Sequence, residues 1–198
     1  MFQPRKNILD MNTLKFDLVK ADQLERAIEL ELDGYPAEEA ASFESFRLRR
    51  SQAPELFFGA FKLKQGSSPD ACSSNINFEL IAYICGTRSS ASHLTHSSMT
   101  QHVPDGSSVC IHSVCVSKEY RRQGVALALL TEYVRRLKLQ RRISVQDDSE
   151  TKLEIERILL ITHEELIPLY AKAGFELVGE SSVKHGERVW YEMMLNLS

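Results

Sequence analysis

The sequence has few of the residue types that mark secreted, membrane or metal-binding proteins. Its 198 residues include only four cysteines, none of them in a C-x-x-C pair, which excludes a dense disulfide framework and is typical of a reducing compartment. No apolar run approaches the ~18 residues that suggest a membrane span, and the first residues lack the apolar core of a signal peptide. We therefore expect a cytoplasmic protein that does not bind membranes.

An excess of charge of one sign is also missing. The formal net charge is -3, so composition gives no indication of a nucleic-acid or membrane-surface partner. No internal repeat is visible. With 43% hydrophobic residues, a chain of this length can bury one sizeable core. We predict a flexible lead-in at residues 1–13 and a single domain at 14–198. The oligomeric state stays open.

Hydrophobic patterns predict strands and helices in the order βααβββαβαββ, which is a mixed sheet covered by helices. Strands are expected at 14–20, 56–63, 78–87, 109–116, 156–162, 175–180 and 188–195, and helices at 21–32, 37–50, 123–138 and 164–174. Asp22 is the expected cap of the first helix. We expect a mobile surface loop at 88–108 and a polar insertion at 139–154.

A basic turn leads from the 109–116 strand into the 123–138 helix. The first turn of a helix has unpaired N–H groups and a partial positive charge, so this junction can bind a phosphate. Gly124 lets a ligand approach the backbone. Residues 118–142 hold eight Lys and Arg against two Glu, among them Lys118, Arg121 and Arg122 at the mouth of the helix. This favours an anionic ligand, although an ordinary basic surface helix would give the same pattern.

The turn "RRQGVA" (121–126) resembles the R/Q-x-x-G-x-G/A turn with which the GNAT superfamily of N-acetyltransferases holds the pyrophosphate of acetyl-CoA. A preceding strand (110–116) and a later strand-helix with a tyrosine (158–179) also match the family in order. The likeness is strongest to serotonin (arylalkylamine) N-acetyltransferases and their fungal polyamine-acetylating relatives, and it covers roughly residues 14–195. It implies an α/β (α+β) fold with a mostly antiparallel central sheet of about seven strands and about four helices.

The resemblance also implies a set of site residues. Tyr170 would stand beside the CoA sulfur. The residues that it assigns to acetyl-CoA, the pantetheine arm first and then the pyrophosphate, are Val114, Cys115, Val116, Arg121, Arg122, Gln123, Gly124, Val125, Ala126 and Leu127. The sequence departs from the family at Cys110, where animal serotonin acetyltransferases have a first histidine, and at Ala126, where many relatives have glycine.

Acetylation of an alkylamine requires a base, because an amine of pKa ~10.4 is protonated at pH 7. Histidine is the side chain best suited to accept that proton. His112 lies on the strand before the turn and is our candidate; His163, after the 156–162 strand, is the rival. The alternative is that His112 is a half-buried strand histidine with its hydrogen bonds satisfied and no role in catalysis. We expect the remaining histidines, His93, His96, His102 and His185, to be solvated.

Expulsion of the CoA thiolate, of pKa about 8.5, is helped by a proton donor, and Tyr170 suits this role unless it only packs in the core. A backbone N–H near Val114 could polarise the acetyl carbonyl. Cys110 lies two residues before His112 and could act as a nucleophile, but direct attack by a bound amine needs none. The same pair could ligate zinc, but no second pair supports a metal, so we expect none.

The acceptor side is expected around an acidic stretch without Lys or Arg, residues 29–44, which would attract a cationic amine. Tyr35 and Pro36 could supply apolar walls. We therefore predict an acetyl-CoA-dependent N-acetyltransferase that acts on a small primary amine, arylalkylamine or polyamine, by direct transfer. A protein N-terminal or lysine acetyltransferase and a non-catalytic acetyl-CoA-binding module remain as alternatives.

Overall fold

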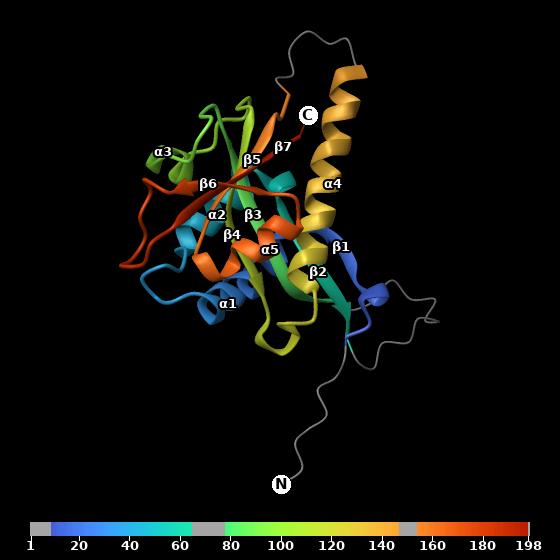
Figure 1. The fold of residues 1–198 in the computed structure, drawn as a ribbon. Coiled ribbons are helices and arrows are strands. Elements are labelled where there is room, and N and C mark those ends of the chain that lie inside the picture. Colours follow the sequence, from blue (N-terminus) through green and yellow to red (C-terminus); the bar gives the residue numbers. More distant parts are fainter. Residues whose placement is uncertain (1–8, 65–77, 147–153, 198) are drawn as a thin grey trace.

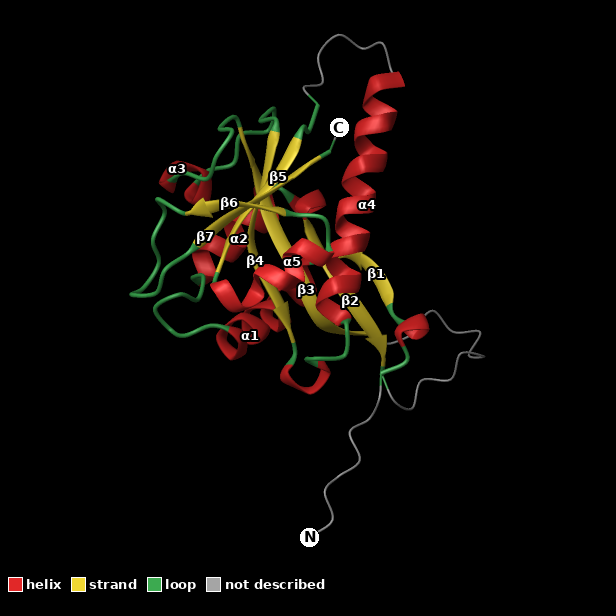
Figure 2. Cartoon of the chain, in the orientation of Figure 1, coloured by secondary structure: helices red, strands yellow, loops and turns green. Residues whose placement is uncertain are grey.

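The computed structural model describes residues 9–64, 78–146 and 154–197, with the side chains of 142–146 left out. Seven strands form one sheet in the order β1-β2-β3-β4-β5-β7-β6 (Figures 1 and 2). The strands are β1 (Lys15–Leu18), β2 (Phe57–Leu63), β3 (Phe78–Ser89), β4 (Ser108–Val116), β5 (Arg157–Thr162), β6 (Glu176–Glu180) and β7 (Tyr191–Asn196). Every neighbouring pair is antiparallel except β4–β5, which is parallel. The predicted fold class is confirmed.

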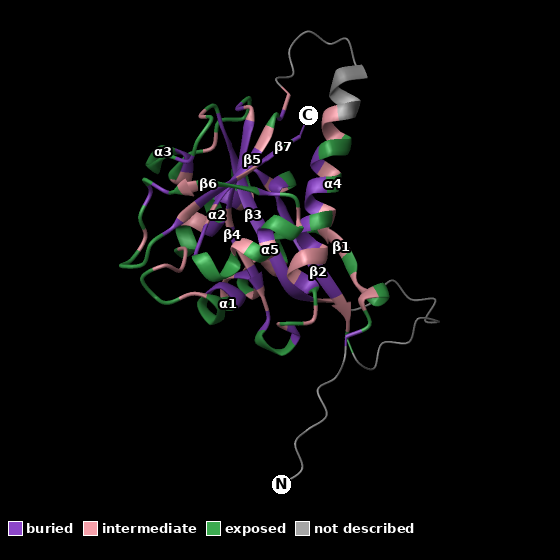
Figure 3. Cartoon of the chain, viewed as in Figure 1, coloured by how far each residue is buried: buried purple, intermediate pink, exposed green. Residues whose placement is uncertain are grey.

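Helices cover both faces of this sheet. They are α1 (Leu24–Gly34), α2 (Phe43–Gln52), α3 (His96–Thr100), α4 (Val125–Gln146) and α5 (Ile167–Lys172). The apolar stripe of α4, with Leu129, Leu130 and Tyr133, packs on one face together with α5, while α1 and α2 pack on the other (Figure 1). The sheet and the helix sides that face it form the core (Figure 3). None of the described helices has the length and apolar character needed to cross a bilayer.

Several helix boundaries differ from the prediction, most of all those of α2 and α4. Helix α2 begins at Phe43 and not at 37, because the Ser42 side chain caps it by accepting the Ser45 N–H. Helix α4 continues to Gln146, through the first half of the predicted polar insertion, since no glycine or proline interrupts it. Residues 147–153 of that insertion lie outside the described part. Asp22 is not a cap but lies within a 3-10 turn (Ala21–Gln23) ahead of α1.

The segment predicted as a mobile loop at 88–108 has structure of its own. Strand β3 extends to Ser89, and Thr95 caps the short helix α3 by accepting the Ser98 N–H. Leu94 is buried, and its N–H donates to the Glu192 carboxylate of β7 at 2.9 Å. The loop prediction was wrong here because polar caps and a single apolar anchor give no periodic signal.

Part of the predicted lead-in also packs on the domain. Leu9 is buried in the core cluster beneath α4, and its N–H donates to the Gln123 side chain at 2.9 Å. A 3-10 turn (Met11–Thr13) then leads into β1. Residues 9–13 are therefore not a loose lead-in, and residues 1–8 lie outside the described part.

Candidate active site

A β-bulge in β4 sets the direction of the central side chains. Cys85 of β3 pairs with Ser113 and Gly86 pairs with Ile111, so His112 is the extra residue between two paired ones. A bulge removes the strict alternation of a strand, and consecutive residues then face the same side. His112 and Ser113 both point toward the α1–α2 face: His112 contacts Thr87, and Ser113 donates to Glu31 of α1 at 3.0 Å.

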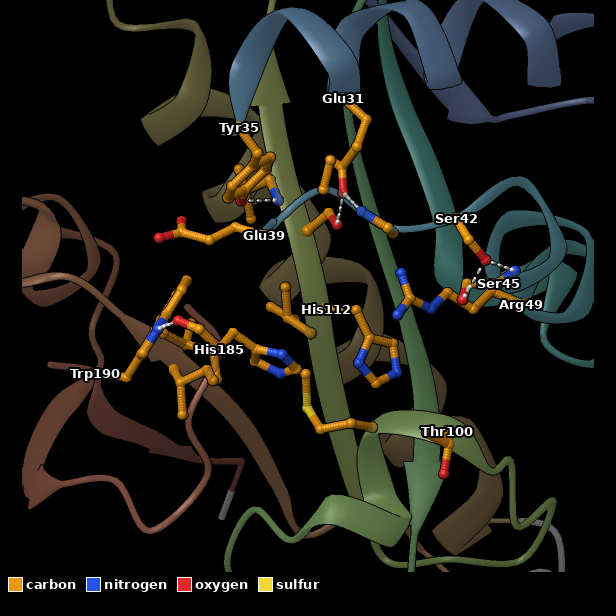
Figure 4. A pocket seen from close by; sticks show the side chains of 18 of the residues that line it. Glu31, Tyr35, Glu39, Ser42, Ser45, Arg49, Thr100, His112, His185 and Trp190 are labelled. Carbon is orange, nitrogen blue, oxygen red and sulfur yellow. Dashed lines mark hydrogen bonds between the residues drawn. The ribbon is translucent and has the colours of Figure 1, made fainter. Parts of the chain in front are cut away.

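Strands β4 and β5 separate just beyond this point. Their parallel pairing covers only Ser108–Cys110 against Arg157–Leu159. A cavity of about 240 Å³ lies next to the opening, lined by Ile111 to Val114 of β4, by Leu160 and Ile161 of β5, and by residues of α1, α2, α3, α5 and the connections between them (Figure 4). The interrupted pairing therefore gives access to backbone and side chains in the middle of the sheet.

His112 and Tyr170 both line this cavity. The His112 Nε2 atom lies 2.7 Å from the Thr87 hydroxyl, while its buried Nδ1 has no hydrogen-bond partner among the described residues. Desolvation of the ring, together with the charge of Arg49 and the proximity of His185, lowers the pKa of His112 well below its usual value, so the ring is neutral at pH 7. Burial likewise raises the pKa of the Tyr170 phenol, which stays protonated.

Helix α5 presents Tyr170 in spite of the proline in its sequence. Pro168 lies in the first turn of the helix, where its missing N–H has no intrahelical partner to lose. The proline is therefore compatible with the helix. Gly174 follows the helix with a φ of 96°, which ends it, and Phe175 packs edge-on against Tyr170.

Tyr35 lies at the C-terminal end of α1 and also lines the cavity. Its hydroxyl oxygen is 3.5 Å from the backbone N–H of Val114, which makes this a long hydrogen bond. Burial is the main cause that raises the pKa of the Tyr35 phenol, followed by the nearby Tyr170. Tyr35 and Tyr170 thus lie close together on the side of the cavity that Val114 borders.

His163 and Pro36 do not line the cavity in the described structure. His163 is buried, with Nδ1 3.1 Å from the Val189 carbonyl and Nε2 3.1 Å from the Glu39 carboxylate. Its ring packs against Trp190 with 3.9 Å between centroids and an interplanar angle of 36°. These contacts connect the α1–α2 segment to the segment before β7, and they leave neither ring nitrogen of His163 facing the cavity.

The basic turn between β4 and α4 adopts the conformation that its sequence favours. Arg122 has a φ of 63° and Gly124 a φ of 86°, and a Cβ atom added at Gly124 would meet no atom within 4 Å. The turn is therefore open to a ligand at the start of α4. Arg121 donates to the carbonyls of Val116 and Asp33, so its guanidinium connects the turn to α1.

The remaining residues assigned to the cofactor occupy different environments. Gln123 uses its side chain within the chain, accepting from Leu9 and donating to the Glu119 carbonyl at 3.0 Å. Cys115 faces α1 beside Glu31, and Val125 is buried at the start of α4. Val116, Ala126 and Leu127 are half-buried. A ligand at this turn would thus meet backbone groups more than the side chains of Arg121 and Gln123.

Residues 80–177 match the family model described as "Acetyltransferase (GNAT) domain". The chain contains a GNAT acetyltransferase domain. Serotonin N-acetyltransferase of Mesocricetus auratus is 30% identical to this chain over 118 residues, which are 60% of this chain and 51% of that protein. The human enzyme of the same name is 25% identical over the same length, again 60% of this chain and 51% of that protein. The chain thus spans about half the length of the curated relatives that it matches.

Solved structures support this fold across most of the chain. Arabidopsis thaliana NAA60 in complex with acetyl-CoA aligns with a TM-score of 0.62 and 20% identity, covering 93% of this chain and 99% of that one. GphF, a GNAT-like decarboxylase in complex with isobutyryl-CoA, aligns with a TM-score of 0.68 and 13% identity, covering 93% of this chain and 100% of that one. At these identities the likeness concerns the fold alone.

Sequence reasoning missed several residues that line the cavity of the GNAT domain. His185 was expected to be solvated, but it lines the cavity and its buried Nε2 has no partner in the described part of the chain. Arg49 of α2 and Trp190 before β7 also line it. Only the clustering of arginines at 47–50 hinted at Arg49, and that pattern is equally typical of a solvated helix. His93 and His96 are exposed as expected.

Proposed function

We propose that this chain is an acetyl-CoA-dependent N-acetyltransferase that transfers the acetyl group to the primary amine of a small molecule, an arylalkylamine or a polyamine, by direct attack in a ternary complex. The observation that carries the proposal is the cavity beside the separated β4 and β5 strands, because His112, Tyr170 and Val114 all line it. The match to the GNAT domain and the partial likeness to serotonin N-acetyltransferases support the same chemistry.

The turn at 121–124 fits the diphosphate of acetyl-CoA. It has two residues with positive φ, an unobstructed approach at Gly124, and the N-terminal end of a 22-residue helix behind it. Backbone N–H groups at such a helix start bind phosphate oxygens, and the helix dipole adds a partial positive charge. When bound, acetyl-CoA supplies the activated acetyl group. Residues 114–116 of β4 would then border its pantetheine arm.

In this proposal His112 accepts the proton of the incoming ammonium group. The Thr87 hydroxyl has a second acceptor, the Ser98 carbonyl at 3.5 Å, which takes the hydroxyl proton. The Thr87 oxygen then accepts from Nε2–H of His112, and Nδ1 keeps a free lone pair as the basic atom. Because the pKa of His112 is lowered, the ring is unprotonated at neutral pH and can act without first losing a proton.

Transfer forms the N–C bond and breaks the C–S bond. The Val114 N–H would donate to the acetyl oxygen as negative charge develops there, in place of its long contact with Tyr35. Tyr170 gives its proton to the departing thiolate, and its raised pKa keeps that proton available. The nitrogen loses its second proton as the amide forms, and this proton restores the Tyr170 phenol. The products are the acetamide, free CoA thiol and one proton released from His112.

The test is thiol release from acetyl-CoA by the purified chain over a panel of tryptamine, phenylethylamine and spermidine. Tyr170→Phe should lower kcat by about 10- to 100-fold while acetyl-CoA affinity stays within about twofold, because the loss concerns a group that acts in the transition state. Tyr191→Phe, on β7 and outside the cavity lining, is the matched control. Thiol release with N-terminal peptides only would favour the protein acetyltransferase. Stabilisation by acetyl-CoA without any thiol release would favour a binding module.

A further inference from the structure

Arg49 is a charged side chain buried against the cavity. It comes from the last turn of α2, only 8% of its surface is exposed, and it is one of the lining residues. Its guanidinium points from α2 into the cavity on the side where His112 lies (Figure 4). A guanidinium keeps its charge at any pH at which a protein folds, and removing it from water costs several kcal/mol unless an anion compensates.

Among the described residues no carboxylate forms an ion pair with Arg49. Its one hydrogen bond there is to the Cys85 Sγ at 3.8 Å. Burial raises the pKa of the Cys85 thiol, so this partner is a neutral and weak acceptor. Two of the acids that line the cavity have other partners: Glu31 accepts from Ala41, Tyr83 and Ser113, and Glu39 contacts His163. The charge of Arg49 therefore faces the cavity without a direct ion pair to a described carboxylate.

Two further polar atoms beside this charge lack partners. Nδ1 of His112 and Nε2 of His185 are buried and have no hydrogen bond within the described structure, and both residues line the cavity. The charge of Arg49 contributes to lowering the pKa of each imidazole, which indicates that it lies near both. Buried polar groups are nearly always paired, so these two unpaired nitrogens, beside a guanidinium whose hydrogen-bond partner is a thiol, indicate that a ligand completes the cavity.

We infer that Arg49 binds a carboxylate of the acceptor, and that among small primary amines the chain therefore prefers an amino acid to the corresponding plain amine. This inference rests on the proposed function and narrows its substrate class. The planar guanidinium matches a carboxylate in a bidentate geometry. The ammonium group of the acceptor is attracted by carboxylates, because Glu31, Glu38 and Glu39 line the same cavity. A zwitterion satisfies both signs, whereas a polyamine leaves Arg49 unpaired.

Matched acceptor pairs that differ only by a carboxylate test the inference: tryptamine with tryptophan, phenylethylamine with phenylalanine, and putrescine with ornithine. The native chain should show the higher kcat/KM for the amino acid of at least one pair. Arg49→Gln should lower kcat/KM for that amino acid by about 10- to 100-fold, mainly through KM, because a hydrogen bond to a charged group is lost. The same variant should lower kcat/KM for the plain amine much less, and Arg49→Lys should restore part of the loss for the amino acid.

Arg47→Gln is the matched control, since Arg47 lies on the same helix, carries the same charge and is exposed. This variant should keep kcat/KM for both members of each pair within about twofold of the native value, as expected for a solvated charge. Far-UV circular dichroism and thermal unfolding of Arg49→Gln, compared with the native chain, show whether the variant folds. Equal losses for amine and amino acid in Arg49→Gln, or a preference of the native chain for the plain amine in every pair, would overturn the inference while the proposed function stands.

Binding of the acetylated products tests the carboxylate subsite at Arg49 separately from the proposed acetyltransferase function, because it does not depend on turnover. Calorimetry with N-acetyltryptophan and N-acetyltryptamine, which also differ only by the carboxylate, should show tighter binding of the former, and Arg49→Gln should abolish the difference. If no acceptor or peptide releases thiol but this difference is present, the proposed function fails and the carboxylate subsite holds. If the two compounds bind equally to the native chain, the subsite is refuted.

Discussion

Burial fixes the protonation of the ionisable side chains around the cavity. Desolvation lowers the pKa of His112 and raises that of Tyr170, so both are neutral at pH 7. The same cause raises the pKa of Cys110 to about 12, which leaves its thiol unionised and unsuited to nucleophilic attack. Burial, more than any ion pair, thus sets the protonation states of His112 and Tyr170 that the proposed chemistry needs.

The free energy of unfolding should therefore decrease as the pH is lowered, and His112 should account for part of that decrease. The unfolded chain has the ordinary His pKa near 6.5 and the folded chain a lower one, so below that pH the unfolded state binds more protons. The free energy of unfolding should drop by up to about 1.4 kcal/mol per pH unit from this residue. Urea unfolding between pH 7.5 and 5.5 should show a smaller loss for His112→Gln than for the native chain. Equal losses would contradict the assignment, and His93→Gln, an exposed change, is the control.

Substitution of two glycines with positive φ, Gly124 and Gly174, distinguishes the effect of backbone strain from an effect on ligand binding. Gly124→Ala and Gly174→Ala each impose a left-handed conformation on alanine, at roughly 1–2 kcal/mol, which thermal unfolding measures. Only Gly124→Ala adds a methyl group to the open turn before α4. It alone should weaken acetyl-CoA binding, by about tenfold or more in a calorimetric titration. Equal acetyl-CoA affinities in the two variants would exclude a diphosphate at Gly124.

At the scale of elements, long periodic segments were predictable from the sequence and the bulge was not. The spacing of Leu129, Leu130 and Tyr133 fixes the buried side of α4, and the apolar 156–162 segment becomes an internal strand. The pattern "CIHSVCV" instead gives no sign that His112 and Ser113 face the same side, because the bulge depends on pairing with β3. Arg49 was missed for a related reason: its burial follows from where α2 packs.

Glu31 joins several elements through one carboxylate. It accepts hydrogen bonds from the Ala41 N–H, the Ser113 hydroxyl and the Tyr83 hydroxyl, which belong to the α1–α2 connection, β4 and β3. Glu31→Gln should destabilise the fold by about 3 kcal/mol, because the new amide presents a donor to other donors. Glu29→Gln, exposed on the same helix, should change it by less than about 0.5 kcal/mol. Denaturant unfolding compares the two, and similar values would contradict a structural role for this carboxylate.

The whole molecule should respond to acetyl-CoA as one cooperative unit. A ligand at 100 times its Kd stabilises the folded state by about 2.7 kcal/mol. For a domain of this size each kcal/mol shifts Tm by roughly 2–4 °C, so we expect a rise of about 5–10 °C. Differential scanning fluorimetry with acetyl-CoA measures it, with adenosine as a control that lacks the diphosphate. No shift, or an equal shift with adenosine, would contradict binding at the turn.

The early end of β4–β5 pairing means that the sheet is continuous at one end and open at the other. The turn proposed for the donor belongs to the β4–α4 junction, whereas α1, α2 and the segment between them supply a large share of the cavity lining proposed for the acceptor. In the proposed reaction each substrate thus depends on a different stretch of the chain. Exchange of residues 36–49 between related proteins should accordingly transfer the acceptor specificity and leave the affinity for acetyl-CoA unchanged.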